Sequence, residues 1–259
     1  MDEFNFTNLL NHHEKVINVI DEPFSYSVTN SFFPKNTIKS ISSSFEFADN
    51  LNLTSDALFQ KTKRAQNDYN LFPLKIKKTV DYLNSKEFLN ILENKFKISN
   101  LIADPSLFGG GMHESRNGGY LKIHADFIYI RKKKLKRVLN LLIYLNEYWE
   151  EKWGGAIELW DQNMKKNFLK LYPHLNNALI FRTDTESNHG FPDPINCPKN
   201  IGRKSLAVYY YVKDESLFKR TKYYYARWKR RPGIDEPKFG DNRNFLEKFK
   251  NNFLFRFNK

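Results

Sequence analysis

Hydrophobic and polar positions follow two different patterns along this chain. Over residues 74–98, apolar side chains recur mostly at spacings of three and four. This spacing predicts either one long helix or two helices joined near Asn84-Ser85. Pro34 stands where a proline is tolerated in the first turn of a helix, which predicts a short helix over 34–44. The preceding segment 23–33 alternates like a strand. The first hundred residues are therefore expected to be mixed, with helix dominant.

Beyond residue 100 the chain is divided by glycine clusters at 109–111, 118–119 and 154–155. Short apolar or alternating runs lie between them, which is typical of strands separated by turns. The predicted strands cover residues 120–127, 137–145, 156–160, 177–182 and 204–212. Their spacing favours a sandwich or a barrel over a parallel βαβ sheet.

The chain shows no internal repeat and no low-complexity linker, which predicts one domain with an appended tail. In this division residues 1–100 form N-terminal helices and lead-in strands that support the core. Residues 101–214 form the β-rich core, and residues 215–259 form a basic, aromatic extension. Within the extension, Phe245, Phe249 and Phe253 stand at helical spacing.

Composition narrows the class of protein. With 259 residues, of which 41% are hydrophobic, the chain can bury a sizeable core, and fibrous, collagen-like and wholly disordered classes are excluded. No apolar run approaches the roughly 20 residues of a membrane-spanning helix, and the acidic start MDEFNFTNLL lacks the features of a secretory signal. The single cysteine, Cys197, excludes an internal disulfide and a Cys-rich metal site. We therefore expect a soluble, cytoplasmic protein with no membrane partner.

The charge is strongly basic, with 42 Lys and Arg against 29 Asp and Glu, a net charge of +13. This balance favours acidic partners such as nucleic acid, anionic surfaces or anionic small molecules. Residues 218–233 mix cations with aromatic side chains, a combination that suits binding of single-stranded RNA, but packing of this segment on the core is the expectation we favour. The basic run 131–136 predicts a solvated loop between two strands, or a surface that attracts an acidic substrate.

A candidate metal site comes from two histidines and one carboxylate. His124 and Asp126 stand two residues apart in a predicted strand, so their side chains project from the same face. His189, in the segment SNHGFP, can complete a two-His, one-carboxylate set, which is typical of non-haem Fe(II) oxygenases. Taken alone, His124 with Asp126 is equally an ordinary strand pair.

A candidate anion site lies on the neighbouring strands. Arg203 and Ser205 share one face of the predicted strand near 204–212, so a guanidinium and a hydroxyl point the same way. Tyr144, on the strand expected to pair with it, can add a phenolic hydrogen bond. A dicarboxylate held by a metal at one end needs such a group at its other end. Without the metal, Arg203 is equally a surface salt-bridge residue and Tyr144 a core tyrosine.

Taken in order, these motifs resemble the catalytic core of the 2-oxoglutarate and Fe(II)-dependent oxygenases. Within that superfamily they are most similar to the prolyl 4-hydroxylase branch, including its bacterial and viral members. The resemblance covers about residues 100–214 and rests on GGYLKIHADF (118–127), RVLNLLIYLNEYW (137–149), WGGAIELWD (153–161), SNHGFP (187–192) and GRKSLAVYYYV (202–212).

The resemblance implies a fold and a set of site residues. The fold is mostly β with flanking helices (α+β), a double-stranded β-helix or jelly roll with the N-terminal helices packed on one sheet. The metal ligands for Fe(II) would be His124, Asp126 and His189. The distal carboxylate of 2-oxoglutarate would bind Arg203 and Tyr144, with Ser205 beside them. Arg137 and Tyr209 fall where substrate-side residues lie in similar prolyl hydroxylases.

The resemblance also implies an activity. We expect a dioxygenase that hydroxylates a prolyl residue of a protein or peptide while 2-oxoglutarate is decarboxylated to succinate and CO2, with O2 consumed and ascorbate as the reductant. Related halogenases carry a small residue where this chain has Asp126, so hydroxylation is implied. Nucleic-acid demethylases typically have a second arginine where this chain has Tyr209, which argues against base demethylation.

Alternatives to this activity remain open. The same chemistry on a free amino acid, a sugar or a lipid headgroup is the nearest, and a non-catalytic basic RNA-binding module is the most distant. Nucleic acid is thus not the favoured partner. The resemblance to bacterial and viral members allows a virus-encoded enzyme that acts in a host cell. The sequence leaves the oligomeric state and the hydroxylated carbon open.

Overall fold

The computed structural model describes residues 6–46, 53–57, 59–127, 129–130, 134–214 and 226–234. The helical spacing of Phe245, Phe249 and Phe253 therefore lies outside the described residues, as does much of the basic run 131–136. The helices are α1 (Phe6–Val16), α2 (Lys35–Ser43), α3 (Leu74–Leu83) and α4 (Lys86–Phe96), with single 3-10 turns η1 (Tyr69–Leu71) and η3 (Glu151–Trp153).

The helical part of the chain agrees with its hydrophobic pattern. Of the two predictions for residues 74–98, two helices is the correct one, and the break falls at Asn84-Ser85. Ser85 caps α4 by accepting a hydrogen bond from the Phe88 N–H at 3.3 Å. The predicted helix over 34–44 is α2, but Pro34 stands at its N-cap, one residue before the first turn in which it was expected. Helix α1 was not predicted, because its segment of the sequence combines helical and strand patterns.

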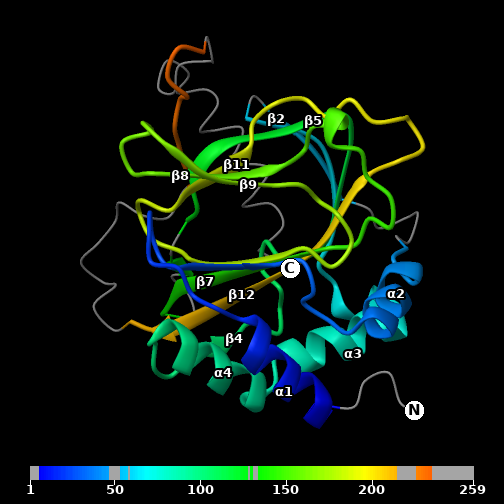
Figure 1. Cartoon of the computed structure of the whole chain (residues 1–259), viewed down its shortest axis with the longest axis vertical. Helices are drawn as coiled ribbons and strands as arrows, with labels where there is room; N and C mark the ends of the chain where they lie inside the picture. The colour runs from blue at the N-terminus through cyan, green and yellow to red at the C-terminus, as the bar shows by residue number, and fades with distance from the viewer. Residues whose placement is uncertain are drawn as a thin grey trace.

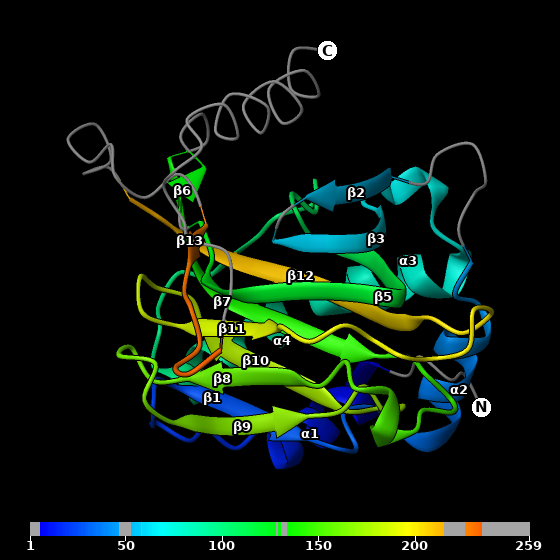
Figure 2. The same ribbon diagram turned by 90° about the horizontal axis from the view of Figure 1, so that it is seen from above.

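Thirteen strands in the described part of the chain form one curled sheet. They pair in the order β1-β10-β7-β12-β5-β11-β8-β9, with the β2–β3 hairpin and β13 on β5, β4 on β12 and β6 on β7. Figure 2 shows the β2–β3 hairpin on one side of the molecule and β9 on the opposite side. Their bounds are β1 (Tyr26–Thr29), β2 (Leu53–Ala57), β3 (Gln60–Gln66), β4 (Ile102–Ala103), β5 (Gly111–Ala125), β6 (Tyr129–Ile130), β7 (Leu135–Tyr144), β8 (Ile157–Trp160), β9 (Asn167–Leu171), β10 (Ala178–Arg182), β11 (Asn188–Phe191), β12 (Arg203–Lys213) and β13 (Arg227–Trp228).

The sheet curls into two layers with helices outside one of them. In Figure 1, β8, β9 and β11 form the upper layer, β7 and β12 the lower layer, and α1, α3 and α4 lie beneath it. This arrangement is the double-stranded β-helix, or jelly roll, that the resemblance implied, with the N-terminal helices on one sheet.

Alternate residues of the lower layer face opposite sides, which decides where the site lies. Leu139, Leu141 and Ile143 of β7 pack with the helices in the main core cluster. Tyr144, in contrast, packs with Phe181 and other side chains from both layers in a second cluster between them. Because side chains alternate along a strand, the interior face of β7 carries Asn140, Leu142 and Tyr144, and that of β12 carries Arg203, Ser205, Ala207 and Tyr209. The predicted sharing of faces is thus confirmed.

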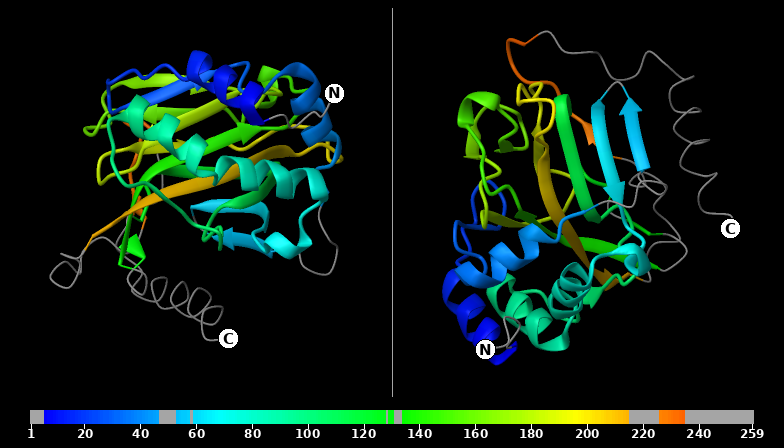
Figure 3. Two further views of the ribbon diagram at one scale, coloured as in Figure 1. Left: turned by 90° about the horizontal axis from the view of Figure 1, so that it is seen from below. Right: turned by 90° about the vertical axis from the view of Figure 1, so that its right-hand side faces the viewer.

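Several parts of the sheet differ from the prediction. The glycine pair at 118–119 was expected to be a turn, but β5 continues through it from Gly111 to Ala125. Gly118 has a φ of 77°, and the pairing of β3 with β5 is irregular at this level, so the pair forms a distortion within a strand. Strand β11 covers the segment around His189, which was expected to follow a strand. The β2–β3 hairpin and β9 carried no recognisable strand pattern; Figure 3 shows the hairpin alongside β5.

No helix among the described residues is long and apolar enough to cross a membrane. The division of the chain at residues 100 and 214 stays a prediction. β1 and β3, from the first hundred residues, are hydrogen-bonded to β10 and β5 of the core sheet.

Candidate active site

The structure brings together the three predicted metal ligands. His124 near the end of β5 is the register partner of His189 on β11, and their ring centroids are 4.6 Å apart. Asp126 follows directly after β5, with Oδ1 3.4 Å from His124 Nε2 and Oδ2 3.9 Å from His189 Nε2. One ligand atom from each residue lies within 4.8 Å of the others. This cluster can hold a metal ion.

Backbone carbonyls orient both histidine rings. His124 Nδ1 lies 2.9 Å from the Lys122 carbonyl, and His189 Nδ1 lies 2.9 Å from the Ser187 carbonyl. A carbonyl can only accept a hydrogen bond, so each Nδ1 carries the proton and donates it. Each Nε2 is then left with a lone pair that faces Asp126, which is the form in which histidine binds a metal.

Asp126 is held as a carboxylate. Arg137 donates from Nη1 to Oδ2 at 3.0 Å, and Asn140 donates from Nδ2 to the same oxygen at 3.4 Å. Burial alone would raise the pKa of Asp126, but the Arg137 guanidinium, 3.0 Å away, brings the pKa well below its usual range. Burial, with the neighbouring His124, lowers the pKa of His189 to about 4. Near neutral pH the site therefore offers a carboxylate and a neutral His189 imidazole, as a divalent cation requires.

A continuous series of rings passes through the histidines. Trp228 of β13 stacks on Phe59 at 4.9 Å between centroids and lies 4.7 Å from the His124 ring. On the far side, Phe181 lies 4.6 Å from the His189 ring. His124 and His189 are therefore packed between aromatic side chains from the β2–β3 turn, the C-terminal segment and β10.

The C-terminal segment 226–234 packs on the core. Its β13 pairs with the end of β5, where Arg227 opposes Ala125 and Trp228 opposes His124. Further on, Arg231 forms a two-point ion pair with Asp193, at 2.6 and 3.0 Å. This arrangement agrees with the packed interpretation of the segment 218–233; Tyr223, Tyr224 and Tyr225 lie outside the described residues.

The predicted anion site lies in the interior between the two layers. Arg203 is buried and donates from Nη2 to the Tyr144 hydroxyl at 2.7 Å and from Nε to the Gly155 carbonyl at 2.7 Å. Because the Tyr144 oxygen accepts from Arg203, its own O–H remains available to donate. Ser205 is the register partner of Tyr144 on the adjacent strand and is also buried. A guanidinium, a phenol and a hydroxyl therefore converge, and they fit a carboxylate.

Arg137 and Tyr209 lie beside the metal site. The Arg137 guanidinium is 3.7 Å from the centroid of the Tyr209 ring and 4.0 Å from that of Phe127. The Tyr209 hydroxyl donates to the Gly109 carbonyl at 3.1 Å. Nε and Nη2 of Arg137 are buried and have no hydrogen-bond partner among the described residues. Arg137 thus holds Asp126 with Nη1, while its guanidinium also lies against the rings of Tyr209 and Tyr211.

Several residues that face the same interior could not be recognised from the sequence. Lys63 and His113 come from β3 and β5, neither of which was predicted over these residues, and Trp228 belongs to the tail. The strand β3 reads QKTKRAQ, a polar run that lacks the apolar alternation of a typical strand. The only feature of this run that stands out in the sequence is its basic, polar composition, which does not by itself predict a strand.

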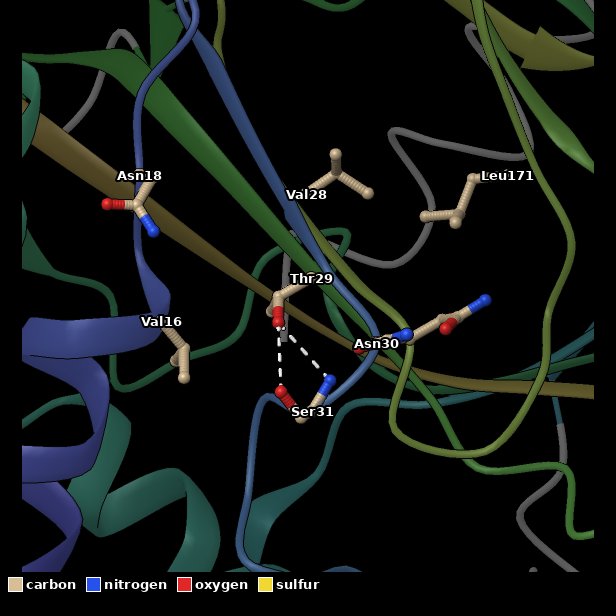
Figure 4. Close-up of a pocket in the computed structure, with 8 residues that line it drawn as sticks. Val16, Asn18, Val28, Thr29, Asn30, Ser31 and Leu171 are labelled. Atoms are coloured by element: carbon tan, nitrogen blue, oxygen red, sulfur yellow. Dashed lines mark hydrogen bonds between the residues drawn. The ribbon is translucent and has the colours of Figure 1, made fainter.

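A separate pocket of about 490 Å³ lies on the outside of the fold, lined by Val16, Asn18, Val28, Thr29, Asn30, Ser31, Leu171 and Asn177 (Figure 4). Its Thr29 hydroxyl bonds within the pocket to Ser31, accepting from the backbone N–H at 3.2 Å. No side chain in this lining is titratable, and none is a predicted site residue.

Comparisons with known proteins bear on the family and the fold of this chain. Residues 110–211, which contain all but one of the motif segments in full, match the model of the 2OG-Fe(II) oxygenase superfamily. The resemblance to this superfamily is therefore confirmed. No sequence among the curated proteins matches the chain.

Two solved structures share the superfamily fold. A prolyl-4-hydroxylase from Pseudomonas putida is 14% identical, with a TM-score of 0.50 over 80% of this chain and 99% of that one. A prolyl 4-hydroxylase from Phytophthora capsici is 17% identical, with a TM-score of 0.53 over 97% of this chain and 75% of that one. At these identities the likeness shows a common fold.

Proposed function

We propose that this protein is an Fe(II)- and 2-oxoglutarate-dependent dioxygenase that hydroxylates a prolyl residue of a protein or peptide. The observation that carries the proposal is the position of His124, Asp126 and His189 beside the Arg203–Tyr144 pair, within one interior. A molecule of 2-oxoglutarate needs a metal site at one end and a carboxylate-binding group at the other.

In this proposal His124, Asp126 and His189 hold Fe(II), while Arg203 and Tyr144, with Ser205, hold the distal carboxylate of 2-oxoglutarate. The donor set fits the metal, because two neutral imidazole nitrogens and one carboxylate leave other coordination positions open. When bound, Fe(II) and 2-oxoglutarate supply the oxidising chemistry, in which O2 is consumed and succinate and CO2 are formed. Ascorbate is proposed as the reductant that keeps the iron ferrous.

The chain's own residues bind, orient and exclude water. Arg137 and Asn140 fix the Asp126 carboxylate, and the carbonyls of Lys122 and Ser187 fix the two imidazoles. The buried positions of Arg203 and Tyr144 keep water away from the carboxylate that they bind. A fixed co-substrate and metal then determine which C–H bond of a bound substrate lies within reach.

Arg137 and Tyr209 are proposed to contact the substrate. The unpaired Nε and Nη2 of Arg137 are suited to donate to a peptide carbonyl, because buried donors without partners are costly. The ring of Tyr209 stacks on the same guanidinium and offers an apolar surface for a pyrrolidine ring. Both positions correspond to those that the resemblance assigned to the substrate side.

The experiment that tests this function measures succinate and peptide mass together. The protein is incubated with Fe(II), ascorbate, 2-oxoglutarate and a panel of proline-containing peptides, with Asp126→Ala as the control variant. We expect succinate formation stimulated by at least one peptide, a gain of one oxygen atom on its proline, and neither in the variant. Succinate formation that depends on Asp126 but is stimulated by a free amino acid or sugar would replace the prolyl substrate. No turnover dependent on iron would overturn the proposal.

A further inference from the structure

Lys63 on β3 points into the same interior as Arg203. β3 pairs with β5 so that Lys63 opposes Ser115, and β5 pairs with β12 so that the same Ser115 opposes Arg203. Directly opposed residues of antiparallel strands project to the same face of the sheet. The three residues therefore form one row across three strands, with the two cations at its ends.

An ion pair on the other face confirms this orientation. Arg64, next to Lys63, donates from Nη1 to Glu114 Oε2 at 2.9 Å, and Arg64 and Glu114 are register partners. Met112, two residues before Glu114, packs in the core cluster on the helix-covered side. Since successive side chains of a strand alternate, Lys63 projects to the opposite, interior side.

Within the described part of the chain, the ammonium group of Lys63 has no counter-ion of its own. It has no hydrogen bond or ion pair among the described residues, and the acidic group that acts on it most strongly, Asp126, is already paired with Arg137 at 3.0 Å. Burial lowers the pKa of Lys63 to about 8, and the nearby Arg203 and Arg137 act in the same direction. His113, also close by, has a pKa lowered well below its ordinary value by burial, so it adds no charge near neutral pH.

We propose that Lys63 is a second anion-binding residue of this interior, which holds a carboxylate that lies between it and Arg203. The inference rests on the proposed function and extends it to the charge of the ligand. The charges of Fe(II) and 2-oxoglutarate cancel when both are bound, and Asp126 offsets one of the three cations Lys63, Arg137 and Arg203. The interior therefore keeps an excess of positive charge near Lys63. This charge either binds a further anionic group or strengthens the binding of the co-substrate beyond what Arg203 provides alone.

The carboxylate that Lys63 binds can belong to either of two molecules. In the first, Lys63 and Arg203 share the distal carboxylate of 2-oxoglutarate. In the second, Lys63 binds an acidic group of the substrate, such as a glutamate beside the proline. The second source would also agree with the net charge of +13, which favours acidic partners.

The test is calorimetry on Mn(II)-loaded protein, in which no turnover takes place. Wild type, Lys63→Met and Lys63→Arg are titrated with 2-oxoglutarate and with 2-oxobutanoate, which lacks the distal carboxylate. Each protein is then titrated with two proline peptides, one with Glu and one with Gln beside the proline. The matched control is Lys61→Met, because Lys61 lies on the same strand and is exposed. Thermal melting checks that each variant folds.

Either of two results supports the proposal. If Lys63 holds the co-substrate, Lys63→Met weakens 2-oxoglutarate binding about tenfold, leaves 2-oxobutanoate unchanged, and Lys63→Arg restores the affinity. If Lys63 holds the substrate, Lys63→Met removes a preference of the wild type for the Glu peptide and leaves 2-oxoglutarate unchanged. Lys63→Met with wild-type affinity for 2-oxoglutarate and the wild-type Glu-to-Gln ratio overturns the proposal while the proposed function stands. Wild type that binds no 2-oxoglutarate overturns the proposed function itself.

Discussion

Arg137 donates from Nη1 to Asp126 Oδ2 at 3.0 Å, while Asp126 Oδ1 faces His124 Nε2. The Oδ2 atom that accepts from Arg137 also lies 3.9 Å from His189 Nε2, so one carboxylate links the guanidinium to both histidines. Arg137 is almost fully buried, so this ion pair lies where removing one partner is costly. The pair both orients the carboxylate and keeps it ionised.

Replacing Arg137 is expected to make metal binding more sensitive to acid. Burial raises the pKa of Asp126 and Arg137 lowers it, so Arg137→Met raises the pKa of this carboxyl group. Protons then compete with the metal at higher pH, and Mn(II) binding is lost earlier as the pH falls. Titration of both proteins with Mn(II) at several pH values between 7 and 4 measures the shift. Loss of Mn(II) binding at the same pH in both proteins would show that Arg137 does not control the ionisation of this carboxylate.

Arg203 and Tyr144 are expected to contribute unequally to 2-oxoglutarate affinity. Arg203→Ala removes the charge and should weaken binding at least tenfold. Tyr144→Phe removes one neutral hydrogen bond and should weaken it by a few-fold. Calorimetry on the Mn(II)-loaded variants gives both dissociation constants. An affinity that neither change alters would place the co-substrate elsewhere.

Trp228 is expected to stabilise the metal site through the ring of His124. Trp228→Ala removes the side chain that packs between Phe59 and His124, so the imidazole loses its lateral support and metal affinity should fall about tenfold. Trp228→Phe retains a ring and should recover most of it. The matched control, Trp160→Phe, alters a partly exposed tryptophan that donates to Glu158. Equal Mn(II) affinity for Trp228→Ala and wild type would contradict this role.

His13 is expected to make the fold sensitive to acid. Its ring is fully buried, with Nδ1 2.8 Å from the Leu9 carbonyl and 2.7 Å from the Tyr82 hydroxyl, and burial lowers its pKa from 6.5 to about 3. Below pH 6.5 the unfolded chain binds a proton at His13 that the folded chain does not. The free energy of unfolding therefore falls between pH 6.5 and about 3, by up to about 5 kcal/mol from this group.

Urea unfolding at several pH values measures that loss, with His13→Phe as the test variant. The variant has no proton to bind at this position, so its free energy of unfolding should depend less steeply on pH. His12→Asn, at the neighbouring and partly exposed position, is the comparison. An equal slope for wild type and His13→Phe would show that His13 is not the titrating group.

The interior strands could be predicted from sequence because their two faces differ in a regular way. In β7 the residues Leu139, Leu141 and Ile143 pack against helices, while Asn140 and Tyr144 face the interior. With a period of two, the chemistry-bearing residues of β7 and β12 fall on one side without knowledge of the fold. The short motifs around His124 and His189 pointed to the three residues that the structure brings together, His124, Asp126 and His189.

The opposite edge of the interior could not be predicted for a physical reason. Strand β3 lines a polar site on one face, with Lys63, and makes the Arg64–Glu114 ion pair on the other, so neither face is apolar and no alternation appears. Trp228 reaches His124 through a strand pairing between residues about a hundred positions apart. Contacts of this kind are decided by the tertiary fold alone.

The most direct test of the account is an anaerobic titration of Fe(II) and 2-oxoglutarate, followed by visible absorption. Without O2 no turnover takes place, so the measurement does not depend on knowing the substrate. We predict a new absorption band that requires both Fe(II) and 2-oxoglutarate, is absent in Asp126→Ala, and needs a much higher 2-oxoglutarate concentration in Arg203→Ala. A wild-type protein that shows no such band, or a band unchanged in Asp126→Ala, would contradict the assignment of His124, Asp126 and His189 as the iron site.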